Sequence, residues 1–312
     1  MRISRPWQLC PPAAARRWLA ALLLAMLVGL PVPARAIDVI ASFSILADLV
    51  AQVGGEQVAV SSLVGREQDG HVFQPRPSEL ARLRNADLVV VNGLGFEGWM
   101  TRLLQSAGYR GPVVVATEGV APLPQPLSPS GAGREAPDPH AWQDPARVQV
   151  YVENIASALA EVDPDHAEIY RQRARRYQER LRQLDEQIAG ELGTLADDRR
   201  TVVTPHAAMR YFGERYGLRF LAAQGPNAGS EPGAREIARL IQQMRASGTA
   251  VIFSESPGTP ALLRQLARES GAPLAGRLYS DTLSPIDGPA ASYLDLMTHN
   301  ARQLREALAG TP

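Results

Sequence analysis

Four residues, His71, His140, His206 and Asp281, have the side-chain types and the positions in the sequence expected of a metal site. Each follows a stretch that is typical of a strand, where the chain turns into a loop. Three imidazole nitrogens and a carboxylate oxygen can fill the four-coordinate shell of a divalent cation such as zinc. The separations of 69, 66 and 75 residues place two ligands in each half of the chain. This arrangement favours capture of an ion between two lobes over chemistry performed with it.

No single member of this set would carry the argument. A lone loop histidine is more often structural or exposed, and the segment around Asp281 could equally be a turn or a helix cap. The remaining histidines, His166 and His299, lie in predicted helices, where we expect solvated side chains rather than metal ligands.

The first 36 residues have the composition of a secretory signal peptide. Arginines without any acid precede an apolar run at 19–30, and residues 34–36 have the small-x-small pattern of a cleavage site. We therefore expect a mature, periplasmic chain that starts at Ile37. The apolar run is short for a membrane span, although an uncleaved anchor is the competing interpretation. Cys10 precedes the run, which is the wrong side for lipid attachment.

Composition narrows the function further. Cys10 is the only cysteine, so the mature chain would have neither a disulfide framework nor a thiolate metal site. The leader contains five arginines and no acid, so the 32 basic and 32 acidic residues of the chain become 27 and 32, a formal charge of −5. Such a chain has no electrostatic footprint for nucleic acid, and nothing in it indicates an obligate oligomer, so we expect a monomer.

Strand-like and helical segments alternate along the chain, which predicts α/β architecture with mostly parallel sheets. We expect strands at 37–42, 58–63, 87–92, 113–116, 200–204, 218–222, 250–254 and 274–278. We expect the shorter helices at 45–54, from 77, and at 96–107, 146–161, 207–216, 230–245, 259–270 and 292–309. The proline-rich segment 122–139 can form neither a helix nor a central strand, so we expect a surface loop.

One predicted helix is much longer than the others. Over 165–192, apolar residues such as Tyr177, Leu181 and Ile188 recur at three- and four-residue spacing. A helix of this length would extend for ~40 Å, which is long for one small lobe. We therefore expect an N-terminal lobe over 37–164, a linking helix over 165–193 and a C-terminal lobe over 194–312.

Several motifs, in this order, resemble those of a known family. They are GHVFQPRPSEL from Gly70, DPHAWQDP from Asp138, PHAAMRYF from Pro205 and SDTL from Ser280. Over residues 37–309 the chain resembles the metal-binding receptors of bacterial ABC importers, the cluster A-I group. The resemblance implies two pseudo-symmetric α/β lobes joined by one rigid helix, with the metal in the cleft between them. It also implies His71, His140, His206 and Asp281 as ligands and a membrane permease as partner.

The same resemblance bears on the choice of metal. Manganese-selective members usually have a carboxylate at the position of His206, and three imidazoles with one carboxylate suit zinc better. We therefore expect Zn²⁺ as the cargo, with manganese as the alternative. Many zinc receptors of the group have a histidine-rich loop before the second ligand, whereas segment 122–139 contains no histidine. The stretch GLGFEGWM from Gly93 looks closest to Azt-type zinc receptors, which implies a periplasmic metallochaperone as a second partner. Glu255 is a candidate for holding a ring N–H of a ligand, and a structural carboxylate that pairs with an arginine is the competing interpretation.

Two other classes of protein fit the sequence less well. A secreted zinc hydrolase keeps one zinc position open for water, whereas this chain offers a fourth ligand. The HExxH and GxSxG motifs are also absent from the sequence, so we do not expect an enzyme. A surface adhesin would show no metal dependence of its thermal stability.

Overall fold

The computed structural model describes residues 36–71, 73–126, 135–224, 233–247, 251–255 and 261–310. The predicted signal peptide lies outside the described residues except for Ala36. Among the described residues, none of the helices combines the length and the apolar character needed to cross a bilayer.

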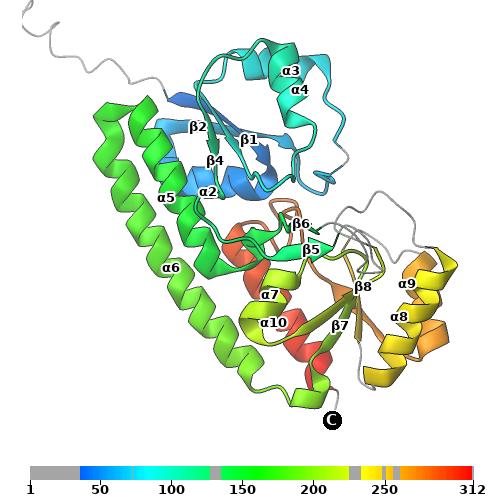
Figure 1. Cartoon of the computed structure of the whole chain (residues 1–312). Coiled ribbons are helices and arrows are strands. Elements are labelled where there is room, and N and C mark those ends of the chain that lie inside the picture. Colours follow the sequence, from blue (N-terminus) through cyan, green and yellow to red (C-terminus); the bar gives the residue numbers. More distant parts are fainter. Residues whose placement is uncertain are drawn as a thin grey trace, which may run out of the picture. The chain divides into compact units, whose positions relative to one another are not determined.

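The first lobe is built on a parallel sheet of strand order β2-β1-β3-β4. Its strands are β1 (Ile37–Phe43), β2 (Val58–Val64), β3 (Leu88–Val91) and β4 (Val113–Val115). Helices α3 (Pro77–Arg84) and α4 (Met100–Ala107) pack on one face, and α2 (Ser44–Gly54) and α5 (Pro145–Val162) pack on the other (Figure 1). The central strands β1 and β3 are largely apolar because both faces of the sheet are covered.

The second lobe repeats this plan with the strand order β10-β9-β7-β8, again parallel. Its strands are β7 (Thr201–Thr204), β8 (Arg219–Ala222), β9 (Val251–Ser254) and β10 (Leu274–Arg277). Helices α8 (Ala234–Ser247) and α9 (Ala261–Ser270) cover the outer face, and α7 (Arg210–Tyr216) and α10 (Tyr293–Ala309) contribute to the core on the inner face. Parallel sheets with helices on both faces confirm the predicted α/β architecture.

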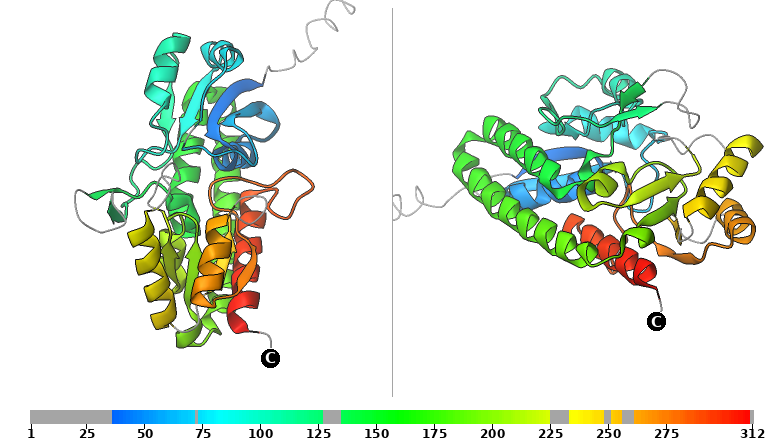
Figure 2. Two further views of the ribbon diagram at one scale, coloured as in Figure 1. Left: turned by 90° about the vertical axis from the view of Figure 1, so that its right-hand side faces the viewer. Right: turned by 60° about the horizontal axis from the view of Figure 1, so that its bottom comes forward.

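Helix α6 (Ala167–Gly193) runs beside both lobes and packs against α2, α5 and α10 (Figures 1 and 2). Its buried stripe includes Tyr177, Leu181 and Ile188, as the spacing predicted. One apolar core combines these side chains with residues from both sheets, so the helix links the two lobes through a shared interior. The prediction of a single long connecting helix is confirmed.

The proline-rich segment differs from the prediction. Instead of a loop without strands, it contributes β5 (Pro124–Pro126) and β6 (Glu135–Pro137), paired antiparallel outside both large sheets. Proline is tolerated there because each strand of a two-stranded ribbon has a free side where no N–H is needed. Residues 127–134 of the segment lie outside the described part of the chain.

The start of α4 also differs, because the helix begins at Met100 rather than at residue 96. Gly93, Leu94 and Gly95 have φ values of 89°, 53° and 85°, which no helix accepts. The carboxylate of Glu97 accepts hydrogen bonds from the backbone N–H groups of Asn92 and Gly93, so this residue closes a turn instead of starting the helix.

Two glycines in helices should respond to alanine in opposite directions. Gly190 is exposed inside α6 and an added Cβ would contact nothing, so Gly190→Ala should raise the free energy of unfolding by about 0.5–1 kcal/mol. In α7, a Cβ on Gly213 would lie 2.6 Å from the carbonyl oxygen of Leu218, so Gly213→Ala should lower the free energy of unfolding. Urea unfolding of the metal-free proteins measures both changes. Shifts of the same sign would contradict the packing of one of the two helices.

Candidate metal centre

The structure brings the four candidate residues together. One ligand atom from each of His71, His140, His206 and Asp281 lies within 4.8 Å of the others. The Nε2 atoms of His71 and His140 are 3.3 Å apart, and the Oδ2 atom of Asp281 lies 2.9 Å from His206 Nε2 and 3.3 Å from His71 Nε2. Around a tetrahedral zinc with bonds of ~2.0–2.1 Å, neighbouring ligand atoms are about 3.3–3.4 Å apart. The cluster can therefore enclose one ion after small side-chain adjustments.

The sheets present three of these residues at the carboxyl ends of their strands. His71 follows β2, His206 follows β7 and Asp281 follows β10, which is where parallel α/β sheets bind ligands. His140 departs from the prediction because it follows β6 of the small hairpin instead of a strand of either large sheet.

Residues next to His140 also hold the segment that carries Asp281. The indole Nε1 of Trp142 and the amide Nε2 of Gln143 both donate to the carbonyl oxygen of Ser280, at 2.8 and 2.6 Å. The backbone beside one candidate ligand is thus fixed by side chains beside another. No pattern in the sequence indicates these contacts, since the two segments are 137 residues apart or more.

The cluster is almost closed to solvent. The side chain of His140 is fully buried, and those of His71, His206 and Asp281 are 3%, 5% and 10% exposed. Aromatic rings complete the wall, with Phe96 edge-on to His71 and Trp142 edge-on to His140 at centroid distances of 4.7 and 5.2 Å. Charges in such a place are weakly screened, so the carboxylates of the cluster need positive charge nearby.

Two carboxylates orient the imidazole rings. The Nδ1–H of His140 donates to Asp138 Oδ1 at 2.7 Å, and the Nδ1–H of His206 donates to Glu255 Oε2 in a very short hydrogen bond. A proton fixed on Nδ1 leaves the Nε2 lone pair free for a metal and makes it more basic. Sequence reasoning identified Glu255 as a candidate for this role but missed Asp138. The position of Asp138 two residues before His140, in the DPH motif, was the signal for it.

The electrostatics of the metal-free cluster resemble an ion pair. Burial lowers the pKa of His206, but the adjacent carboxylates of Glu255 and Asp281 raise it well above 6.5. Burial raises the pKa of Asp281, yet the neighbouring imidazoles, His206 first, hold it well below 3.8. Among the described residues, Asp281 Oδ1 and Glu255 Oε1 are buried without a hydrogen-bond partner. Buried oxygens normally have partners, so an electropositive occupant fits this position.

The other two histidines lie outside the cluster. His166 pairs with Asp163 in the short turn before α6. His299 is half-buried against Tyr279 and bonds to the carbonyl oxygen of Arg277, and burial lowers its pKa. The expectation that His299 is solvated was wrong, because α10 turns this residue toward the second sheet.

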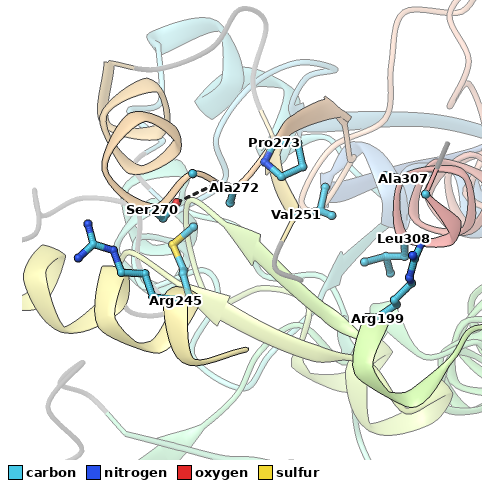
Figure 3. Close-up of a pocket in the computed structure, with 11 residues that line it drawn as sticks. Arg199, Arg245, Val251, Ser270, Ala272, Pro273, Ala307 and Leu308 are labelled. Carbon is cyan, nitrogen blue, oxygen red and sulfur yellow. Dashed lines mark hydrogen bonds between the residues drawn. The ribbon is translucent and has the colours of Figure 1, made fainter. Parts of the chain in front are cut away.

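A separate cavity in the second lobe contains no member of the cluster (Figure 3). It is lined by Arg199, Arg245, Val251 and Pro273, among others. Val251 starts β9 and Pro273 precedes β10, whereas His206 and Asp281 follow strand ends. The cavity therefore lies at the opposite edge of the sheet and takes no part in the metal site.

The raised pKa of His206 predicts how metal affinity depends on pH. A metal that binds His206 Nε2 must displace the proton there, so metal affinity should fall with decreasing pH from a value above 6.5. The protonated imidazole also stabilises the metal-free fold. This contribution to the free energy of unfolding is fully present below about pH 6.5, the pKa of histidine in the unfolded chain, and it is lost as the pH rises through the higher pKa of His206 in the folded protein. Glu255→Gln removes a carboxylate that raises the pKa, so its affinity should decline only at lower pH. Chelator competition between about pH 5 and pH 9 measures the metal affinity of both proteins. Identical pH profiles for Glu255→Gln and the unmodified protein would contradict this prediction.

Comparison with known proteins agrees with the fold and the cluster. Residues 39–307 match the family described as "Zinc-uptake complex component A periplasmic". The chain is 33% identical to the manganese-binding lipoprotein MntA of Halalkalibacterium halodurans over 264 residues, which cover 85% of this chain and 86% of the relative. It is 32% identical to the iron-binding protein YfeA of Yersinia pestis over 265 residues, with coverage of 85% and 84%.

Solved structures give the same result. The manganese-bound periplasmic metal-binding protein from Candidatus Liberibacter asiaticus superimposes with a TM-score of 0.78 at 30% identity. The periplasmic zinc-binding protein TroA from Treponema pallidum gives 0.79 at 27% identity, and both comparisons cover 87% of this chain and 99% of the other. The predicted resemblance and the expectation that the chain is not an enzyme are confirmed. The chain therefore belongs to the ZnuA family of periplasmic metal-binding receptors, the substrate-binding proteins of ABC importers.

Proposed function

We propose that this protein captures Zn²⁺ in the periplasm and delivers it to the membrane permease of an ABC importer. In this proposal His71, His140, His206 and Asp281 are the four ligands. The observation that carries it is the convergence of their ligand atoms within 4.8 Å, in a nearly closed site, from segments far apart in the sequence. The +2 charge meets one ligand carboxylate, and the remaining +1 lies beside the carboxylates of Asp138 and Glu255, which accept the Nδ1–H groups of His140 and His206.

The choice of zinc depends on the donor set of this chain, since relatives are named for manganese, iron and zinc. Manganese prefers more oxygen donors and a higher coordination number, whereas three nitrogens and one oxygen suit tetrahedral zinc. Glu255, an additional carboxylate beside the cluster, already accepts a hydrogen bond from His206. This hydrogen bond favours Glu255 as an acceptor that orients His206 over Glu255 as a fifth metal ligand.

We further propose that residues 1–36 are a cleaved signal peptide and that the mature protein is a monomer starting at Ile37. The lobe boundaries that go with this proposal are 37–164 and 194–312, with the linking helix over 165–193. The resemblance of the stretch from Gly93 to Azt-type receptors supports a periplasmic metallochaperone as a second partner.

Removing one ligand should abolish tight binding. Isothermal titration of the metal-free protein should show one zinc site, and His140→Ala should weaken it by more than about a hundredfold, because the buried site loses one of its four proposed ligands. The matched control is His166→Ala, since His166 lies outside the cluster and should leave the affinity unchanged. Unchanged affinity in His140→Ala would contradict the ligand assignment.

Thermal stability should report which metal the folded protein binds more tightly. A ligand that binds only the folded state stabilises it by about 2.7 kcal/mol at one hundred times its Kd, so the tighter metal gives the larger rise in Tm at equal concentration. We expect the order zinc, then manganese, then chelator, measured by differential scanning calorimetry. A larger rise with manganese would identify manganese as the cargo, and no rise with either metal would contradict the receptor function.

A further inference from the structure

The segment that follows β2 reaches across to the loop that carries Asp281. The backbone N–H of Glu67 donates to Thr282 Oγ1 at 2.8 Å, and the Glu67 carboxylate pairs with Arg277 Nη1 at 2.8 Å. Thr282 is the neighbour of Asp281 in the chain, and Glu67 lies four residues before His71. These two bonds therefore join the segment before His71 in one lobe to the segment around Asp281 in the other.

Arg66 reinforces the same connection. Its Nη1 donates to the carbonyl oxygens of Ser284 and Ala291, at 2.6 and 2.9 Å, so one guanidinium holds both ends of the loop after Asp281. Hydrogen bonds from a charged donor are stronger than neutral ones. The hydroxyl of Ser44 adds a further bond to this loop, accepting from the Leu283 N–H at 3.0 Å.

Arg277 links this contact to the third imidazole. Its Nε donates to the backbone carbonyl oxygen of Glu255 at 3.2 Å, and the Glu255 side chain accepts the Nδ1–H of His206. The guanidinium also stacks over the Tyr279 ring at 4.3 Å, which fixes its orientation. A single side chain thus contacts Glu67 in the first lobe and the support of His206 in the second.

The backbone of Glu67 indicates a conformation that these bonds maintain. Its φ of 61° lies in the left-handed region, which residues other than glycine adopt uncommonly. Such a conformation persists only where surrounding contacts hold it. Loss of the bonds to Thr282 and Arg277 would let this turn relax and would release the segment that leads to His71.

We propose that Glu67 and Arg277 form a latch that keeps His71 and Asp281 in place and slows dissociation of the bound ion. Both are positioning residues, because neither belongs to the candidate ligand cluster. The inference depends on the proposed function, since it takes the four clustered residues as ligands. The paired side chains are 26% and 21% exposed, so dissolved salt reaches the latch and should weaken it.

The test is the rate at which a chelator removes zinc from the full chain, measured by stopped flow. Glu67→Gln keeps the size of the side chain and removes its charge, and release should become about two- to fivefold faster. Arg277→Gln should have a similar effect, and the double variant should be no faster than the faster single variant. Raising the ionic strength should accelerate release from the unmodified protein and leave the rate of Glu67→Gln unchanged.

Glu214→Gln is the matched control. It breaks another pair between the lobes, Arg147–Glu214, at 3.0 Å, which holds neither Asp281 nor His71, so its release rate should equal that of the unmodified protein. Tight zinc binding with equal release rates in Glu67→Gln and the unmodified protein would overturn the latch alone. No zinc binding by the unmodified protein would overturn the proposed function and the latch with it. If Glu67→Gln fails to fold, a release rate of the unmodified protein that is independent of salt overturns the latch.

Discussion

The structure depends on one electrostatic requirement, the compensation of a carboxylate held almost out of water. Asp281 lies among three imidazole nitrogens, and against the effect of burial the carboxylates of Glu255 and Asp281 raise the pKa of His206, so that its proton provides positive charge in the metal-free cluster. Around the cluster, the carboxylates of Asp138 and Glu255 accept the Nδ1–H groups of His140 and His206. The two sheets meet this requirement by directing their strand ends to one place, and the core along α6 holds them there.

Most elements of the fold could be predicted because their sequence periods are clear. The β1 and β3 strands are largely apolar, and the spacing of Tyr177, Leu181 and Ile188 predicts the buried face of α6. The prediction was wrong where hydrogen bonds between nearby segments override the local pattern. Glu97 bonds back to the turn before it and delays the start of α4, and the prolines of segment 122–139 pair as a ribbon that their composition did not indicate.

The sequence singled out the four clustered residues because motifs and donor types identify them without geometry. Their supports were mostly not predictable, since they depend on contacts between remote segments. Trp142 reaches the carbonyl oxygen of Ser280 across 138 residues, and Arg277 reaches Glu67 across 210. No local pattern encodes such pairs, because each follows from the packing of two lobes formed by distant parts of the chain. The two carboxylates behind the imidazoles are the exceptions, since Glu255 was singled out from the sequence and the place of Asp138 beside His140 is visible there.

The interior shared by both lobes has a consequence for how the chain folds. Buried side chains such as Leu46, Leu181, Phe253 and Met297 belong to one continuous cluster that crosses from the first sheet to the second. Neither half therefore has a complete apolar centre, and a fragment ending at the linking helix would leave much of that surface open to water. The polypeptide should therefore unfold as a single cooperative unit. Although the two lobes have similar architectures, neither should fold on its own.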